Sequence, residues 1–192
     1  MRFLATRILS AVAIVALSTT TRAATCETLE RLSLPNTRIT QSEMVPAGDF
    51  KIPGAPPTAG PLRQLPAFCR VTARITPTTD SDIRIEVWLP VNGWNGKFQA
   101  VGNGGWAGAI SYGELAMALQ SGYASASTNT GHDGDGSDAS FALGHPEKVT
   151  DFAWRAVHEM TLKAKALISV FYGKSPAFSY WNGCSTGGKQ GL

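Results

Sequence analysis

Three residues near the end of the 192-residue sequence have the types and spacing of a nucleophile site. Gly183, Ser185 and Gly187 form a Gly-x-Ser-x-Gly pattern. In a nucleophile elbow this pattern forms a tight strand-to-helix turn, and the small flanking residues let the serine hydroxyl project from the sheet. Such a hydroxyl is a weak nucleophile that needs a base, usually a histidine oriented by a carboxylate. The pattern therefore predicts Ser185 as the nucleophile of an acyl-transfer reaction. The alternative is a glycine-rich turn that merely contains a serine.

Acyl transfer also needs hydrogen-bond donors for the oxyanion that develops on the substrate. One donor is expected to be the backbone N–H of Thr186, the residue after the nucleophile. A second should come from the glycine-rich stretch Gly102–Gly108, where the lack of side chains lets the backbone approach a carbonyl closely. We predict Gly105 as the second donor and Gly104 as the alternative.

The other members of a Ser-His-acid triad are not evident in this sequence. In an elbow-type hydrolase the acid and then the histidine follow the serine along the chain, yet no acidic residue or histidine follows Ser185. His132, His145 and His158 all precede it. We expect His158 on a helix surface, His145 in a loop without a visible partner, and His132 in a loop hydrogen-bonding role near the active edge. The chain as given is therefore expected to be truncated, with little or no activity.

The elements expected around these residues form an α/β pattern. Residues 26–66 are rich in Pro, Gly, Thr and Ala and predict an irregular arm, with at most a short helix near residues 27–32. The rest predicts the first half of an α/β-hydrolase fold, a mostly parallel sheet flanked by helices, without its lid domain and C-terminal strands. We expect strands over 69–76, 82–89, 97–101, 123–128 and 177–182, and helices over 113–120, over 151–172 and from 186 onward.

The longest expected helix, over 151–172, has a clear apolar face. Asp151 is expected at its N-terminal end, where a negative charge suits the helix dipole, and Gly173 at its C-terminal end. Lys163 is expected away from the apolar face. That face comprises Ala153, Val157, Met160, Ala164, Leu167, Ile168 and Phe171.

The N-terminus reads as an export signal, which makes residues 1–24 a signal peptide and residues 25–192 a partial catalytic domain. Secretion or a periplasmic location follows, with no stable membrane anchor. The net charge of +3 counts 17 basic and 14 acidic residues, and three of the arginines lie in the signal. The mature chain is then about neutral, which excludes nucleic acid as a partner.

Three cysteines in an exported chain leave one unpaired. Cys26 and Cys69 are the natural disulfide, and the partner of Cys184 is expected outside this sequence. Residues 133–138 resemble a calcium loop at a glance. However, the EF-hand spacing requires Gly where Asp138 stands and Glu where Gly144 stands, so we expect no metal site in this chain.

The elbow and the glycine loop together resemble the tannase and feruloyl esterase family. The resemblance rests on residues 183–191 (Gly-Cys-Ser-Thr-Gly-Gly-Lys-Gln-Gly), 94–98 (Trp-Asn-Gly-Lys-Phe), 102–105 (Gly-Asn-Gly-Gly), 138–148 and 155–161. It implies a serine esterase that cleaves esters of aromatic acids, such as galloyl or feruloyl esters, without an organic cofactor. It also implies a disulfide between Cys184 and a cysteine beside the catalytic histidine, and a lid domain that often holds structural calcium.

The chain lacks that lid, the triad aspartate and the His-Cys element, so only Ser185, Cys184, Thr186 and the glycine loop match the family's site. Two alternatives stay open. One is another α/β-hydrolase, a lipase or a peptidase. The other is a non-catalytic exported binding domain.

Overall fold

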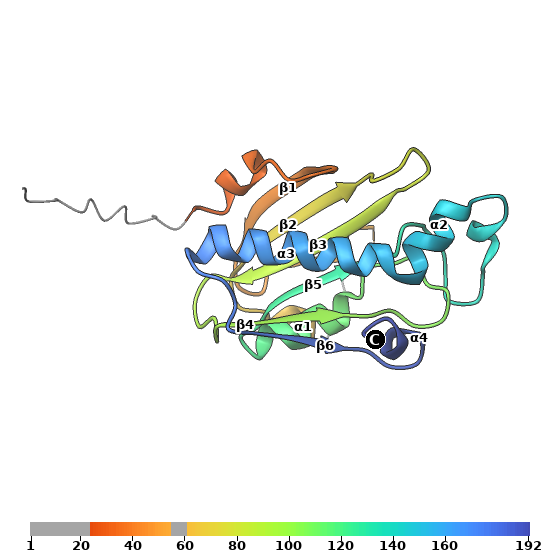
Figure 1. Ribbon diagram of the computed structural model, residues 1–192. Coiled ribbons are helices and arrows are strands. Elements are labelled where there is room, and N and C mark those ends of the chain that lie inside the picture. The colour runs from red at the N-terminus through yellow and green to blue at the C-terminus, as the bar shows by residue number, and fades with distance from the viewer. Residues whose placement is uncertain (1–23, 55–60) are drawn as a thin grey trace, which may run out of the picture.

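The computed structural model describes residues 24–54 and 61–192 (Figure 1). The expected signal peptide lies outside the described residues except for Ala24, so it stays a prediction. No helix in the described part of the chain has the length and apolar character needed to cross a bilayer. The elements are η1 (Glu27–Arg31), β1 (Thr37–Val45), η2 (Pro61–Gln64), β2 (Phe68–Ile75), β3 (Ile83–Pro90), β4 (Lys97–Val101), α1 (Tyr112–Gln120), β5 (Ala124–Thr128), η3 (Ser140–Ala142), α2 (Pro146–Thr150), η4 (Asp151–Arg155), α3 (Ala156–Tyr172), β6 (Phe178–Asn182) and α4 (Thr186–Lys189).

The six strands form one mixed sheet in the order β1-β2-β3-β5-β4-β6. Strands β1, β2 and β3 pair antiparallel, and β3 is also antiparallel to β5. Strands β5, β4 and β6 run parallel, so their carboxyl ends meet at one edge of the sheet. The loops after these three strands therefore converge there, as Figure 1 shows around α4. This α/β arrangement agrees with the predicted fold class, but the sheet is mixed and not mostly parallel as expected, because three of its five strand pairings in the described chain are antiparallel.

Helices cover both faces of the sheet because its central strands are apolar on both sides. On one face α3 packs on alternate residues of β2 and β3, including Val71, Ile85 and Val87. On the other face α1 packs near Phe68 and Trp88. All five residues of β5 are buried, so only small side chains fit between the two helices. The strand expected over 123–128 therefore lies inside the sheet, between β3 and β4.

The expected irregular arm is wrong in one respect, because β1 runs through it as an edge strand. Its apolar alternation is hidden by a bulge, where the pairing with β2 shifts between Ile39 and Gln41. A bulge inserts an extra residue and moves later side chains to the opposite register. Ile39 and Ser42 are therefore buried on the face that holds the Cys26–Cys69 disulfide, whereas Val45 is buried on the other face with Phe68 and Trp88. The buried positions consequently recur every three residues, a spacing that no strand pattern detects.

The long helix starts earlier than the sequence predicted. Pro146 occupies the first turn of α2, and the chain continues through a π-helical stretch, η4, into α3. Asp151 is therefore inside the helix and fully buried, where its carboxylate pairs with Arg155 at 2.5 Å. Ala153, expected on the apolar face, lies within this π-helical stretch and is exposed. Lys163, expected away from that face, is buried on it between Met160 and Leu167 and pairs with Glu159. The helix ends at Gly173, with φ 69°, as predicted.

A disulfide joins the N-terminal segment to the sheet. Cys26 and Cys69 are bonded across a sequence separation of 43 residues, which confirms the predicted pair. Both side chains are buried in the core beneath α3. The bond therefore fixes η1 against β2.

Candidate active site

Ser185 lies on a strained turn between β6 and α4. Its backbone has φ 55° and ψ −127°. Among the described residues only two others that are not glycine have positive φ, Asn36 and Thr130. A non-glycine residue in such a region costs free energy, and strain of this kind gathers at functional sites. The turn has the conformation of a nucleophile elbow, and it leaves the Ser185 side chain exposed.

Two glycines make this turn possible because the backbone approaches itself closely. A Cβ atom at Gly183 would stand 2.3 Å from the carbonyl oxygen of Gly187. One at Gly187 would stand 2.8 Å from the carbonyl oxygen of Asn103, in the loop after β4. Beneath the turn, the indole of Trp181 donates a hydrogen bond of 2.7 Å to Gly187 O.

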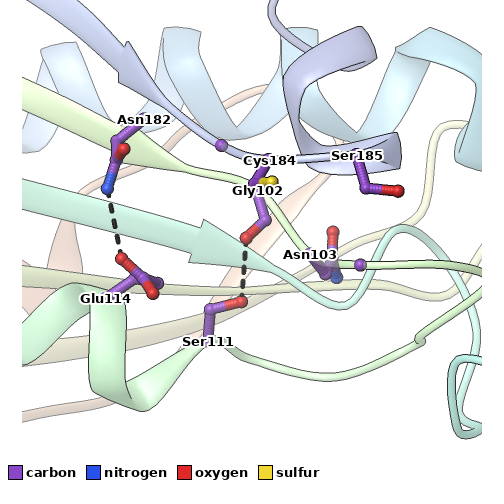
Figure 2. Close-up of a pocket in the computed structure, with 9 residues that line it drawn as sticks. Gly102, Asn103, Ser111, Glu114, Asn182, Cys184 and Ser185 are labelled. Atoms are coloured by element: carbon purple, nitrogen blue, oxygen red, sulfur yellow. Dashed lines mark hydrogen bonds between the residues drawn. The ribbon is translucent and has the colours of Figure 1, made fainter.

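A cavity of about 440 Å³ opens beside Ser185. Figure 2 shows that it lies between the elbow, the loop after β4 and the start of α1. Glu114 is the one charged side chain of its lining within the described chain, and its carboxylate accepts a hydrogen bond from Asn182 at 3.1 Å. The lining consists of Gly102, Asn103, Gly104, Ser111, Glu114, Asn182, Gly183, Cys184 and Ser185.

The two predicted oxyanion glycines lie differently. Gly104 lines the cavity together with Ser185, and a Cβ atom there would meet nothing within 4 Å. Gly105 has φ 56° and is packed against the carbonyl oxygen of Gly136. Thr186 opens α4, where the first N–H groups of a helix have no partner within the helix. These N–H groups are suited to stabilise a negative charge beside Ser185.

Asn103 is a site residue that the sequence did not single out. Its side chain is 8% exposed, and its amide nitrogen donates to the carbonyls of Ala107, Ala109 and Thr128. Its backbone N–H donates to Gln190 in the segment after α4 at 3.2 Å. Asn103 thus ties together the loops after β4 and β5 and the elbow. The only sequence signal for Asn103 was its place between two glycines directly after a strand.

Ser111 and Glu114 were also missed, because they belong to a different element from the motif. The Ser111 hydroxyl donates to Gly102 O at 3.0 Å, so the residue before α1 is fixed to the loop after β4 (Figure 2). Glu114 lies one turn further along α1. The sequence did predict a helix over 113–120 directly after the glycine loop, and this was the one indication that residues near its start could reach the site.

None of the three histidines lines the cavity in the described structure. His158 is exposed on α3, as predicted, beside Trp154. His145 does have a partner, contrary to the prediction, because its Nδ1 lies 3.0 Å from the Asp80 carboxylate. His132 is buried and its Nε2 lies 2.7 Å from Trp106 O, which agrees with the expected loop role.

The acidic stretch 133–138 has its carboxylates engaged within the protein. Asp133 pairs with Arg84 at 2.6 Å. The hydroxyl of Ser137 donates a hydrogen bond to the Asp135 carboxylate, and this bond, together with one from the Ser137 backbone N–H, lowers the pKa of Asp135. Across residues 24–54 and 61–192 no group of three or more His, Cys, Asp or Glu could hold a metal ion. The carboxylates of Asp133 and Asp135 are thus already paired within the protein.

Cys184 and Trp106 complete the surroundings of the elbow. Cys184 is a free, exposed thiol on the cavity wall. Trp106 follows the predicted oxyanion glycines and is 46% exposed, with its ring tilted against Phe152 at 5.2 Å between centroids. It is not part of the cavity lining.

Comparison with known proteins agrees with this geometry. A family model described as tannase and feruloyl esterase matches residues 69–192. An uncharacterized esterase of Xanthomonas campestris pv. campestris is 43% identical over 92% of this chain and 30% of its own length. A probable feruloyl esterase B-1 of Aspergillus fumigatus is 37% identical over 84% of this chain and 31% of its own length.

Solved structures show the same likeness. The crystal structure of feruloyl esterase B from Aspergillus oryzae superposes with a TM-score of 0.77 and 35% identity, over 86% of this chain and 32% of that one. A tannin acyl hydrolase from Aspergillus niger gives a TM-score of 0.62 at 25% identity, over 82% and 30%. The chain spans about a third of the length of the relatives it matches.

Proposed function

Because the chain belongs to the tannase and feruloyl esterase family, we propose that the full-length protein is a serine carboxylic ester hydrolase acting on esters of aromatic acids. The observation that carries this proposal is the backbone of Ser185, held at φ 55° between a parallel strand and a helix, at the wall of a cavity. The names of the relatives add the substrate class, since several are feruloyl esterases.

The proposed reaction proceeds through an acyl-enzyme. Ser185 Oγ attacks the ester carbonyl carbon and gives its proton to a histidine base. The N–H groups of Thr186 and Gly104 stabilise the resulting oxyanion. The protonated base then gives its proton to the departing alcohol, and water hydrolyses the acyl-enzyme to release the acid.

We favour Gly104 over Gly105 as the second oxyanion donor because Gly104 faces the same cavity as Ser185. The histidine base and its carboxylate are proposed to come from sequence outside residues 1–192. The support is that no described histidine lines the cavity and that the relatives are about three times longer. No organic cofactor takes part in this reaction scheme.

The test compares Ser185→Ala with Ser175→Ala in the full-length protein. Ser175 is an exposed serine whose hydroxyl contacts only Ser169 among the described side chains, so it is a matched control. We expect hydrolysis of methyl ferulate or methyl gallate, and labelling by a fluorophosphonate, to be lost in Ser185→Ala alone. Turnover that persists at the wild-type rate in Ser185→Ala would refute the proposal.

Assays of the same full-length protein also test the two alternative functions, another α/β-hydrolase and a non-catalytic binding domain. A lipase or peptidase would prefer long-chain lipid esters or peptides when these are tested beside aromatic esters. A non-catalytic binding domain would bind its ligand equally well in Ser185→Ala, and Ser185 would not react with the fluorophosphonate.

We further propose that the protein is exported to the periplasm or beyond. The Cys26–Cys69 disulfide supports this proposal, because such bonds persist in oxidising compartments. N-terminal sequencing of the purified protein should then start at Ala24 or Thr25. A cytoplasmic protein that retains Met1 would contradict it.

Two details of the full-length protein follow from the family resemblance and are proposed with it. Cys184, a free thiol here, would pair with a cysteine outside this chain. Peptide mapping without reduction would detect the cross-linked peptide. Structural calcium would belong to a lid outside this chain, and a chelator should then lower the melting temperature.

A further inference from the structure

The loop that carries Gly104 is held in place by the loop after β5. Residues 104–107 of this loop form a turn in which the Ala107 N–H donates to Gly104 O at 3.1 Å. Trp106 N–H donates to Gly136 O and Gly108 N–H to Gly134 O, each at 2.9 Å. The two loops thus meet along three residues, and the geometry of one depends on the other.

Two side chains of the loop after β5 reach the turn itself: the Thr130 hydroxyl donates to Ala107 O at 3.4 Å, and the His132 ring makes the shorter contact. Its Nε2 lies 2.7 Å from the carbonyl oxygen of Trp106. A carbonyl oxygen only accepts hydrogen bonds, so Nε2 must carry a proton and donate it. The other ring nitrogen, Nδ1, lies 3.5 Å from the hydroxyl of Thr130. The contact with Trp106 therefore fixes the ring's tautomer.

The imidazole is itself locked by packing. The side chain of His132 is 4% exposed, and its ring stacks on Phe141 with centroids 3.6 Å apart and planes 14° from parallel. Phe152 closes a third side, edge-on at 5.7 Å. A ring held in this way presents its N–H at a fixed point, which an exposed side chain could not do.

Both backbone polar groups of Trp106 are therefore hydrogen-bonded: its N–H donates to Gly136 O, and its carbonyl oxygen accepts from His132. Trp106 is the third residue of the turn that begins at Gly104. Rotation of this turn would redirect the N–H of Gly104, a residue that lines the cavity beside Ser185. Asn103 holds the same turn from the other side, through its bond to Ala107 O.

We propose that His132 is a positioning residue that fixes the orientation of the Gly104 turn, and hence of the oxyanion donor, by donating its Nε2–H to Trp106 O. The inference rests on the proposed function, in which the Gly104 N–H stabilises the oxyanion. His132 touches neither substrate nor nucleophile in this scheme. It is therefore distinct from the histidine base, which is proposed to lie outside this chain.

The test uses two substitutions in the full-length protein that separate the donor from the ring. His132→Phe keeps an aromatic ring to stack on Phe141 but removes the N–H. His132→Gln removes the ring but keeps a side-chain N–H that can reach the Trp106 carbonyl. His158→Phe and His158→Gln are the matched controls, because His158 is exposed on α3.

We expect His132→Phe to lower kcat for methyl ferulate by about 10- to 100-fold, since misplacing a catalytic donor by about 1 Å costs up to about 100-fold. KM should change by less than about threefold, because the donor acts on the transition state. His132→Gln should retain kcat within about fivefold of the wild type. Both His158 variants should match the wild type.

Hydrogen exchange gives a readout that does not depend on activity. The amides of residues 104–108 should exchange faster in His132→Phe than in His132→Gln, with the rest of the sheet unchanged. Equal exchange in the two variants, or a loss of kcat in His132→Gln but not in His132→Phe, would overturn the positioning role. If the wild type shows no turnover that depends on Ser185, the proposed function fails, whereas the exchange comparison still decides the role of His132.

Discussion

Replacing Gly183 by alanine tests whether the elbow depends on close backbone approach. The new Cβ atom would stand 2.3 Å from Gly187 O, about 1.1 Å inside the 3.4 Å at which ordinary contacts begin. The obstacle is backbone, not the end of a flexible side chain, so the turn itself must move. A shift of about 1 Å at a nucleophile costs on the order of 100-fold in rate, which corresponds to about 2.7 kcal/mol.

We therefore expect Gly183→Ala to lower kcat about 100-fold in the full-length protein, and to slow labelling of Ser185 by a fluorophosphonate by a similar factor. Overpacking of this kind also destabilises a protein by about 1–3 kcal/mol, which a urea titration would measure. Gly113→Ala is the matched control, because its Cβ atom would meet nothing within 4 Å and the residue lies in α1. That control should keep full activity and should stabilise slightly. Wild-type kcat and labelling in Gly183→Ala would refute the reasoning.

Three further predictions concern stability and are each measured by urea denaturation or thermal unfolding of the full-length protein. Removing the disulfide with Cys26→Ser and Cys69→Ser should cost about 4 kcal/mol in the chain-entropy model for a loop of this length, and an unchanged midpoint would contradict it. Glu86→Ala should cost about 3–5 kcal/mol, because it leaves the buried guanidinium of Arg70 without its closest ion pair; a loss below 1 kcal/mol would show that the pair is dispensable. Burial raises the pKa of Tyr172, so as the pH rises the unfolded chain loses this proton before the folded protein does. The free energy of unfolding should therefore fall as the pH rises above about 10, and it should fall less steeply in Tyr172→Phe. Identical alkaline profiles for the two proteins would exclude this tyrosine as a cause.

The sequence predicted the elements whose signals are local. Strands β2 and β3 show strict alternation, and their antiparallel pairing follows from the short turn between them. The Gly-x-Ser-x-Gly pattern marks the elbow because the turn's geometry depends on a few neighbouring residues. For the same reason Gly173, which ends α3 with a positive φ, was evident from its type and position.

The sequence patterns mispredicted elements whose form depends on contacts with residues far away in the chain. Strand β1 was missed because its pairing with β2 includes a bulge, which breaks the alternation. The start of the long helix was misplaced because Asp151 resembles an N-terminal residue. In the structure Asp151 lies inside the continuous helix, where its buried carboxylate pairs with Arg155 one turn further on.

For the candidate site, the sequence alone determined which chemical groups are present: a serine between two glycines, a second glycine-rich loop, and a pair of cysteines that form a disulfide. These features follow from residue types that the backbone needs at tight turns. Only the tertiary structure decided which groups share the cavity. The parallel ends of β4 and β6 bring Gly104 and Asn103 to Ser185, and helix α1 adds Glu114. Contact with the loop after β5 packs Gly105 against Gly136. Strand order and loop contacts depend on packing between residues far apart in the chain, which no local pattern records.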